Sequence, residues 1–302
     1  MARNLIVGFA TNQDRQSVEV FCKSALKSHS AEDCHIVIIT NKYESYFLDL
    51  EKSGVIFFNT VSRYSKKTNK ISKLINRIVL HSLRVGNKLK LSKYIPDIMD
   101  SYPLLIEAWH HPHFARWFAY KRYLEMSGAY GEIFIADVKD VVFQSSVFRN
   151  VEGQYLNLFK QHVDYGDKDW DTKWYREAWG ERALSEIVGK PAICIGTLVG
   201  TLESVRTMVS NLVDFYGKYP FKGVEQAGFN YMIYNGKFDV DYSIVENIDN
   251  QVATLTAKAY PHVAFDGQNI VRKNGNSVIP AVHMYDRFAE TLKVRSLYTE
   301  VD

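Results

Sequence analysis

Short apolar runs alternate with an amphipathic helical pattern over the first sixty residues. Residues 4–10, 35–41 and 54–59 are apolar runs typical of buried strands, and residues 17–28 carry apolar side chains at helical spacing. Strands and helices that alternate in this way indicate a parallel sheet with crossover helices. The pattern therefore predicts an α/β fold.

A later apolar run, residues 133–143, is interrupted by Asp137 and Asp140. Two carboxylates that approach a core repel each other and lose solvation, and a divalent cation between them would remove that cost. Residues three apart on a strand face opposite sides of the sheet, so these two converge only if the chain turns or bulges between them. We expect a cation site that can hold a diphosphate, and the sequence leaves open which carboxylate binds the metal directly.

The rest of the chain continues the α/β pattern. Residues 191–200 predict a strand that enters a glycine-containing turn, residues 202–216 predict a helix, and a further helix is expected to begin near Glu225. A short apolar strand then leads to His283. His110, His111 and His113 are expected in a loop that leads into a helix rather than in a metal site. Because no linker separates these elements, we expect a single domain over residues 1–302.

Basic residues are concentrated in one segment. Residues 52–96 contain eleven Lys or Arg and no Asp or Glu, although the whole chain has a net charge of only +3. Apolar residues at helical spacing within this segment predict a basic amphipathic helical insertion at about 60–105. It either packs its apolar face on its own domain or contacts an anionic membrane surface or a lipid-linked acceptor. The residues expected to make that contact are Lys66, Lys67, Lys70, Lys73 and Arg77.

Residues 150–185 form a predicted loop region on the acceptor side. Three of the five tryptophans lie here, at Trp170, Trp174 and Trp179, mixed with aspartates. Sugar-binding sites use such mixtures, because sugar rings stack on aromatic faces while carboxylates accept hydroxyl protons. Local packing is the alternative interpretation.

The motifs, taken in order, resemble those of retaining GT-A glycosyltransferases, the group that includes glycogenin and bacterial lipopolysaccharide galactosyltransferases. Four blocks carry the resemblance: residues 7–12, Arg116 leading to Asp137 and Asp140, residues 193–200 followed by Glu225, Gln226 and Asn230, and finally His283. The acidic motif is one residue wider than the usual Asp-x-Asp. Glu225 replaces an aspartate of the group.

The resemblance implies a GT-A fold and a site for a nucleotide-sugar donor, with UDP as the expected nucleotide. Asp137, Asp140 and His283 would hold Mn²⁺ or Mg²⁺. The nucleotide and its diphosphate would contact Asp137 and the residues Phe9, Ala10, Thr11, Asn12, Arg116 and Arg287. Glu225 and Gln226 would lie near the reacting carbon, and the resemblance implies retention of anomeric configuration.

The function expected from the sequence is a metal-dependent glycosyltransferase acting on a glycan or lipid-linked acceptor in surface polysaccharide synthesis, such as lipopolysaccharide. Two alternatives are a non-catalytic membrane-surface or glycan-binding protein of the same fold and, ranked lower, a sugar-phosphate nucleotidyltransferase. No nucleic-acid-binding motif is present, so no nucleic acid partner is expected. The three cysteines are far apart in sequence, and no apolar run is long enough to span a bilayer, so the expected location is the cytoplasm. Contact with the inner face of the membrane would be peripheral.

Overall fold

The computed structural model describes residues 2–11, 13–41, 47–63, 78–79, 81–82, 85, 102–149, 155–219 and 224–299. Most of the basic insertion lies outside these residues, including Lys66, Lys67, Lys70, Lys73 and Arg77, and so does Asn12. The expected membrane contact therefore stays a prediction. Among the described helices, none has the length and apolar character needed to cross a membrane.

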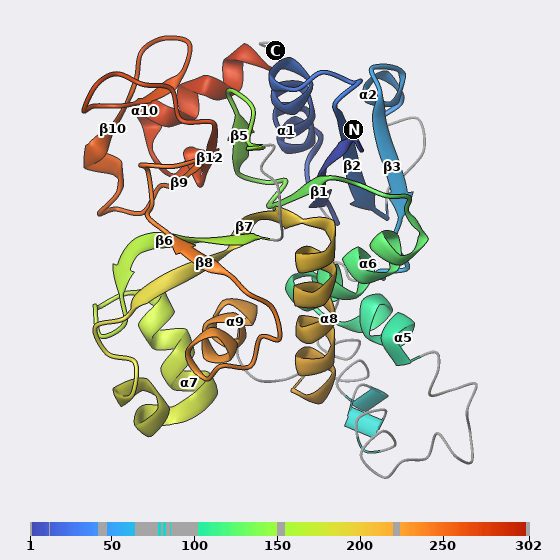
Figure 1. The fold of residues 1–302 in the computed structure, drawn as a ribbon, viewed down its shortest axis with the longest axis vertical. Helices are drawn as coiled ribbons and strands as arrows, with labels where there is room; N and C mark the ends of the chain where they lie inside the picture. Colours follow the sequence, from blue (N-terminus) through green and yellow to red (C-terminus); the bar gives the residue numbers. More distant parts are fainter. Residues whose placement is uncertain are drawn as a thin grey trace.

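A seven-stranded sheet forms the centre of the molecule (Figure 1). Its strands, in spatial order, are β3 (Val55–Asn59), β2 (Cys34–Thr40), β1 (Asn4–Phe9), β4 (Glu132–Ala136), β7 (Pro191–Thr201), β6 (Leu156–Asp164) and β8 (Ser243–Val245). All run in the same direction except β7, which is antiparallel to both of its neighbours. The predicted α/β fold with a mostly parallel sheet is confirmed.

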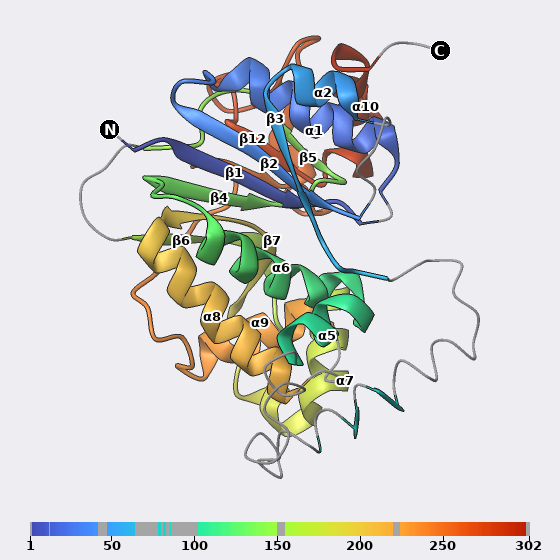
Figure 2. The same cartoon turned by 90° about the vertical axis from the view of Figure 1, so that its right-hand side faces the viewer.

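Helices cover both faces of this sheet (Figure 2). One face packs on α1 (Arg15–Ser28) and α2 (Leu48–Lys52), and the other on α5 (Tyr102–Trp109), α6 (Pro112–Met126), α8 (Leu202–Lys218) and α9 (Glu225–Tyr234). Strand β1 shows why helices cover both faces. Its side chains alternate, with Leu5 and Val7 packed on the α6 side and Ile6 on the α1 side, and all three are fully buried.

A smaller sheet packs beside the first and consists of β5 (Val141–Phe143), β12 (Ala281–His283) and β9 (Val252–Thr254). The other C-terminal elements are the hairpin of β10 (Val263–Phe265) and β11 (Ile270–Arg272), helix α10 (Ala289–Leu292), and the short 3₁₀ helices η2 (Tyr260–His262), η3 (Tyr285–Arg287) and η4 (Lys293–Leu297). Strand β12 is antiparallel to β5, with His283 opposite Val141. This pairing brings the C-terminal histidine beside the acidic motif.

The prediction of a loop region at 150–185 is wrong for its described part, which contains β6 and helix α7 (Trp170–Ser185). Both elements are irregular, which explains why no periodic hydrophobic pattern predicted them. The register of β6 against β7 shifts twice, and His162 within β6 has φ 57°. Helix α7 is interrupted at Gly180, which has φ 87°, so neither element keeps a regular period.

Candidate functional site

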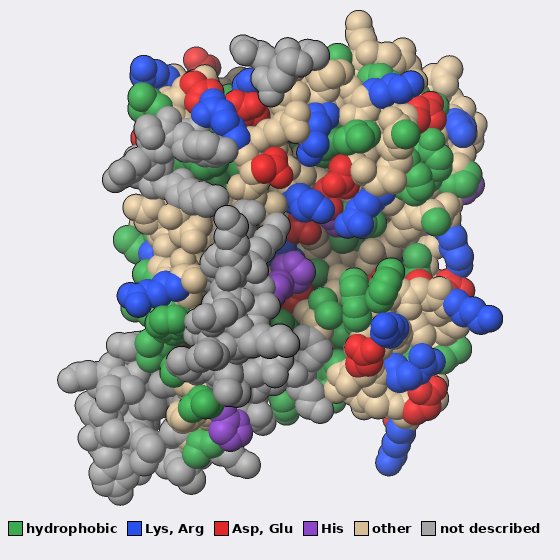
Figure 3. Space-filling model, turned by 180° about the vertical axis from the view of Figure 1, so that it is seen from behind, with side chains coloured by type: hydrophobic (Ala, Val, Ile, Leu, Met, Phe, Trp, Pro, Cys, Tyr) green, Lys and Arg blue, Asp and Glu red, His purple; other side chains and the backbone are tan. Residues whose placement is uncertain are grey.

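A pocket of about 860 Å³ lies where β4 ends. Its wall comes from the ends of β1 and β12, the middle of β7, and the first turns of α6, α7 and α9. On the face shown in Figure 3, carboxylates, basic side chains and a histidine meet around a hollow in the middle of the molecule. The volume suits a small-molecule ligand, and open α/β sheets bind ligands at the carboxyl ends of their strands.

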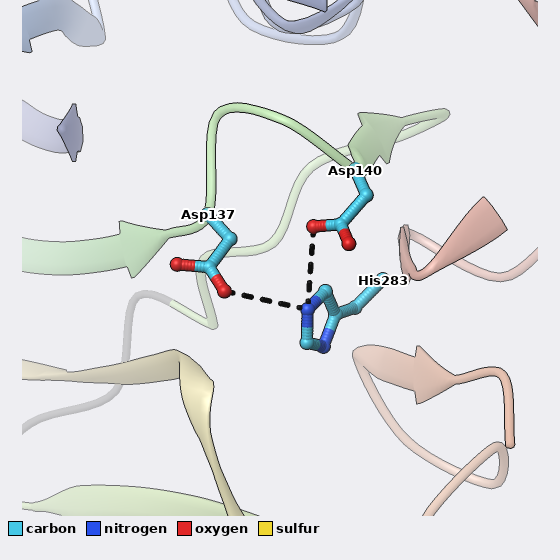
Figure 4. Close-up of side chains that lie close together, drawn as sticks. All are labelled: Asp137, Asp140 and His283. Carbon is cyan, nitrogen blue, oxygen red and sulfur yellow. Dashed lines mark ion pairs between the residues drawn. The ribbon is translucent and has the colours of Figure 1, made fainter. Parts of the chain in front are cut away.

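Two carboxylates and one imidazole converge in this pocket (Figure 4). The Nε2 atom of His283 lies 3.6 Å from Oδ2 of Asp137 and 3.5 Å from Oδ1 of Asp140. One possible ligand atom from each of the three residues lies within 4.8 Å of the other two. Neighbouring ligand atoms around a six-coordinate cation of this size are about 3 Å apart, so a small inward movement would suit one. Two oxygens and one imidazole nitrogen are donors that suit Mn²⁺ or Mg²⁺, and the residues present therefore fit the implied metal.

A buried turn makes this convergence possible. Strand β4 ends at Ala136, residues 138–140 turn, and β5 begins at Val141 in the other sheet. Val138 is 1% exposed and anchors the turn in the core beneath α1. Gly8 makes room for the side chain of Val138, because a Cβ at position 8 would lie 2.3 Å from a methyl carbon of Val138. The turn expected from the Asp-x-x-Asp spacing is thus confirmed.

Two residues of β7 shape the space around the imidazole. A Cβ on Gly196 would lie 2.6 Å from both Oδ2 of Asp137 and Cε1 of His283, so only glycine leaves these side chains their present positions. Cys194 places its Sγ 3.3 Å from Nδ1 of His283. A contact at Nδ1 helps to fix the ring with Nε2 directed at the carboxylates.

Arg116 connects the acidic motif to the start of α9. It is 6% exposed, its Nη1 pairs with Oδ1 of Asp137, and its Nη2 pairs with Oε1 of Glu225. Burial works to lower the pKa of Arg116, but the two carboxylates outweigh it and raise that pKa. Burial likewise works to raise the pKa of Asp137, but Arg116 and His283 hold it below its usual value. A buried guanidinium therefore keeps Asp137 ionised.

The two predicted catalytic residues line the pocket, but protein groups already bind their polar atoms. Besides Arg116, Glu225 accepts a hydrogen bond of 2.7 Å from the indole N–H of Trp117. Burial raises the pKa of Glu225, and Arg116 and Trp117 oppose that rise. Gln226 accepts from the backbone N–H of Ile195 at 3.1 Å and donates to the carbonyl of Ile193 at 2.7 Å. Their direct catalytic roles stay predictions.

The predicted nucleotide loop reaches the pocket only in part. Phe9 and Thr11 line it, and the buried Oγ1 of Thr11 has no hydrogen-bond partner in the described chain. Ala10 packs instead into the core beneath α1, and its N–H donates to the carbonyl of Ile39 at 2.8 Å. Side-chain contact of Ala10 with a nucleotide is therefore not supported, because its methyl group points into the core.

Basic side chains from several elements surround the acidic motif. Arg287 lines the pocket as expected, 3.7 Å from Oδ2 of Asp140. Lys139, Lys168 and Lys258 also line it and were not predicted as site residues. Lys139 lies inside the acidic motif and could have been found there, whereas no sequence pattern marks Lys258, which tertiary folding brings to the site. Carboxyl groups line the same pocket in similar number, and Lys258 pairs with Asp167 among them, so the lining as a whole is not strongly basic.

The histidine cluster lies where α6 begins, the helix-entry position expected from the sequence, and His113 also lines the pocket. The Nδ1 atom of His111 accepts a hydrogen bond from the backbone N–H of His113 at the start of α6, and Pro112 occupies the first turn. The cluster therefore starts the helix that carries Arg116.

Asp171 is a further carboxyl in the pocket wall, and it is 9% exposed. Burial and the nearby Asp169 raise its pKa to about 6 from 3.8. A raised carboxyl pKa stabilises the fold most below pH 3.8, and this contribution is lost as the pH rises to 6. At pH 7 the charged form therefore costs about 3 kcal/mol, since each pKa unit corresponds to roughly 1.4 kcal/mol.

Asp171→Asn is accordingly expected to raise the free energy of unfolding at pH 7 by up to about 3 kcal/mol. The gain over the parent protein should shrink towards zero at pH 4. Urea unfolding between pH 4 and 8 measures it, with the exposed Glu177→Gln in the same helix as a control. A gain that does not depend on pH would contradict the buried-charge explanation.

Comparison with known proteins adds information on the fold. No protein-family model matches this sequence, and no curated protein matches it. Among solved structures, the apo form of the glycosyltransferase GlyE from Streptococcus pneumoniae TIGR4 is 11% identical with a TM-score of 0.50. All of this chain is covered, but only 61% of GlyE.

Two further glycosyltransferases align over nearly their whole length. The galactosyltransferase LgtC, in complex with donor and acceptor sugar analogs, is 12% identical with a TM-score of 0.47, over 99% of this chain and 97% of LgtC. A glycosyltransferase involved in glycosylation of the major capsid of PBCV-1 is 10% identical with a TM-score of 0.45, over 99% and 100% of the two chains. The likeness to GlyE shows that this chain shares the fold of that glycosyltransferase.

Proposed function

We propose that this protein is a metal-dependent glycosyltransferase that uses a nucleoside diphosphate sugar, with UDP as the expected nucleotide. The observation that carries the proposal is the convergence of Asp137, Asp140 and His283 in one pocket. These residues come from two separate segments, and the small sheet brings them together through the pairing of β12 with β5. Charged groups that are brought together in a pocket carry a desolvation cost, and such a cost is typical of a site that binds a cation.

The proposed chemistry is cleavage of the bond between sugar and diphosphate. A divalent cation held by Asp137, Asp140 and His283 would supply positive charge to the departing diphosphate. Arg287 would add hydrogen bonds to the phosphate oxygens from the exposed side. Thr11 and Phe9 would receive the nucleoside at the end of β1. The hydroxyl of Thr11, which has no partner among the residues that the structure describes, would hydrogen-bond a ribose or base.

We assign Arg116, Glu225 and Gln226 positioning roles in this reaction. Arg116 holds the Asp137 carboxylate, and Glu225 holds Arg116 from the other side. Gln226 binds the backbone of β7 beside Gly196, which keeps that strand close to the metal ligands. The retention of configuration and the lipid-linked acceptor implied by the resemblance belong to the same proposal.

The test is release of nucleoside diphosphate from UDP-, GDP- and CDP-sugars, each with and without Mn²⁺. We expect one nucleotide class to be cleaved, slowly to water and faster with an acceptor, and only when the metal is present. Tight binding of a nucleotide sugar without any cleavage would instead favour a non-catalytic glycan-binding protein of the same fold.

A further inference from the structure

A part of the pocket wall that the proposed donor site does not use comes from β6 and the first turn of α7. It contains the indole rings of Trp170 and Trp174, whose centroids are 6.0 Å apart with an interplanar angle of 31°. Trp170 is 63% exposed, an unusual state for the largest apolar side chain. The Lys173 ammonium lies over one face of the Trp170 ring, 4.9 Å from its centroid, so this exposed indole can offer its other face to a ligand.

Two polar side chains in the same wall have unused hydrogen-bonding atoms. Gln161 and Asp171 are 7% and 9% exposed, and both line the pocket. Neither Nε2 of Gln161 nor Oδ1 of Asp171 has a partner at hydrogen-bonding geometry in the described chain. The side-chain amides of Gln226 and Gln161 nevertheless lie close enough to Asp171 to lower the pKa of that carboxyl, so Gln161 and Asp171 are neighbours.

This pair matches one kind of ligand group better than others. A buried donor and a buried acceptor without partners are costly in a folded protein, and such a cost is tolerated at binding sites. A hydroxyl group both accepts and donates, so a single sugar hydroxyl can accept from Nε2 of Gln161 and donate to Asp171. A lipid chain would leave both polar atoms unsatisfied.

We propose that Gln161, Asp171 and Trp170 form the subsite for a saccharide acceptor, with one pyranose ring stacked on Trp170 and its hydroxyls on the two polar side chains. The inference rests on the proposed function, since it takes the rest of the pocket as the donor site. The exposure of Trp170 assigns the subsite to the acceptor rather than to the donor sugar, because a longer glycan can continue from the rim into solvent.

The test is saturation-transfer-difference NMR on the protein with Mg²⁺ and UDP. The probes are methyl glycosides of glucose, galactose, mannose and N-acetylglucosamine. We expect transfer to the ring protons of at least one glycoside. Trp170→Ala should weaken its binding about tenfold, Gln161→Ala should also weaken it, and Trp170→Phe should retain most of it. Trp109→Ala, which removes an indole outside the pocket lining, is the matched control and should have no effect.

The UDP signals in the same spectra separate the two proposals. If UDP binds but no glycoside receives saturation, or if Trp170→Ala leaves the transfer unchanged, the acceptor subsite is wrong and the donor site stands. If UDP itself does not bind, the proposed function fails and the acceptor subsite fails with it.

Discussion

Replacing His283 by alanine is expected to lower the metal-dependent release of nucleoside diphosphate by at least about a hundredfold, the effect of losing one group that stabilises developing charge. The imidazole is the only nitrogen donor among the three candidate ligands. Its removal leaves two carboxylates, which bind a divalent cation less tightly and in a less defined geometry. Asp137→Asn should act in the same direction, because it removes one of the two negative charges.

Binding of Mn²⁺ by each variant can be followed by electron paramagnetic resonance, alongside the rate of cleavage. His262→Ala is a matched control, since His262 is an exposed residue of η2 that does not line the pocket. Thermal unfolding without metal should show that His283→Ala remains folded. Normal cleavage by both His283→Ala and Asp137→Asn would show that the metal site is assigned to the wrong residues.

Replacing Arg116 by methionine is expected to reduce the free energy of unfolding by about 3–5 kcal/mol, the usual cost of removing one partner of a buried ion pair. Methionine fills similar space, so the loss reflects charge more than volume. Glu225 is 3% exposed. Without the guanidinium, only the hydrogen bond from Trp117 still stabilises the charged form of this buried carboxyl. Asp137 loses the strongest influence that keeps its pKa low.

Denaturant unfolding of Arg116→Met, Glu225→Gln and the double variant measures the coupling between the two residues. At pH 7 the double variant should be about as stable as Arg116→Met alone, because burial raises the pKa of Glu225 to about 8 even beside Arg116 and the carboxyl is neutral once the guanidinium is removed. Arg182→Met is the control, since that arginine is 97% exposed and lies 4.0 Å from Glu186. Equal stability of Arg116→Met and the parent protein would contradict the role assigned to this pair.

The first half of the sheet could be predicted from sequence because its pattern is local. The apolar runs of β1, β2 and β3 and the helical period of α1 are continuous, and the structure confirms each one. Region 150–185 gave no such pattern, since the register shifts in β6 and the interruption of α7 at Gly180 break the period. Helix α5 was missed because the predicted basic insertion was taken to end at about residue 105, inside this helix.

The candidate site shows the same distinction between local and long-range information. Asp137 and Asp140 could be found from sequence because a carboxylate at the end of a buried strand is anomalous by itself. His283 was linked to them only through the resemblance, since it lies 143 positions after Asp140 and the pairing of β12 with β5 brings it close. The bonds of Glu225 to Arg116 and of Gln226 to β7 could not be predicted, because no local pattern encodes partners that far apart.

The most direct test of the central claim is a thermal-shift measurement with UDP, GDP, CDP and CMP, each with and without Mn²⁺. A ligand that binds only the folded protein raises its apparent stability by mass action. We predict a clear rise with one nucleoside diphosphate, expected to be UDP, only when Mn²⁺ is present, and its loss in His283→Ala. No shift with any nucleotide, or a shift that is the same without metal and in His283→Ala, would contradict the claim that these three residues hold a cation for a nucleotide-sugar donor.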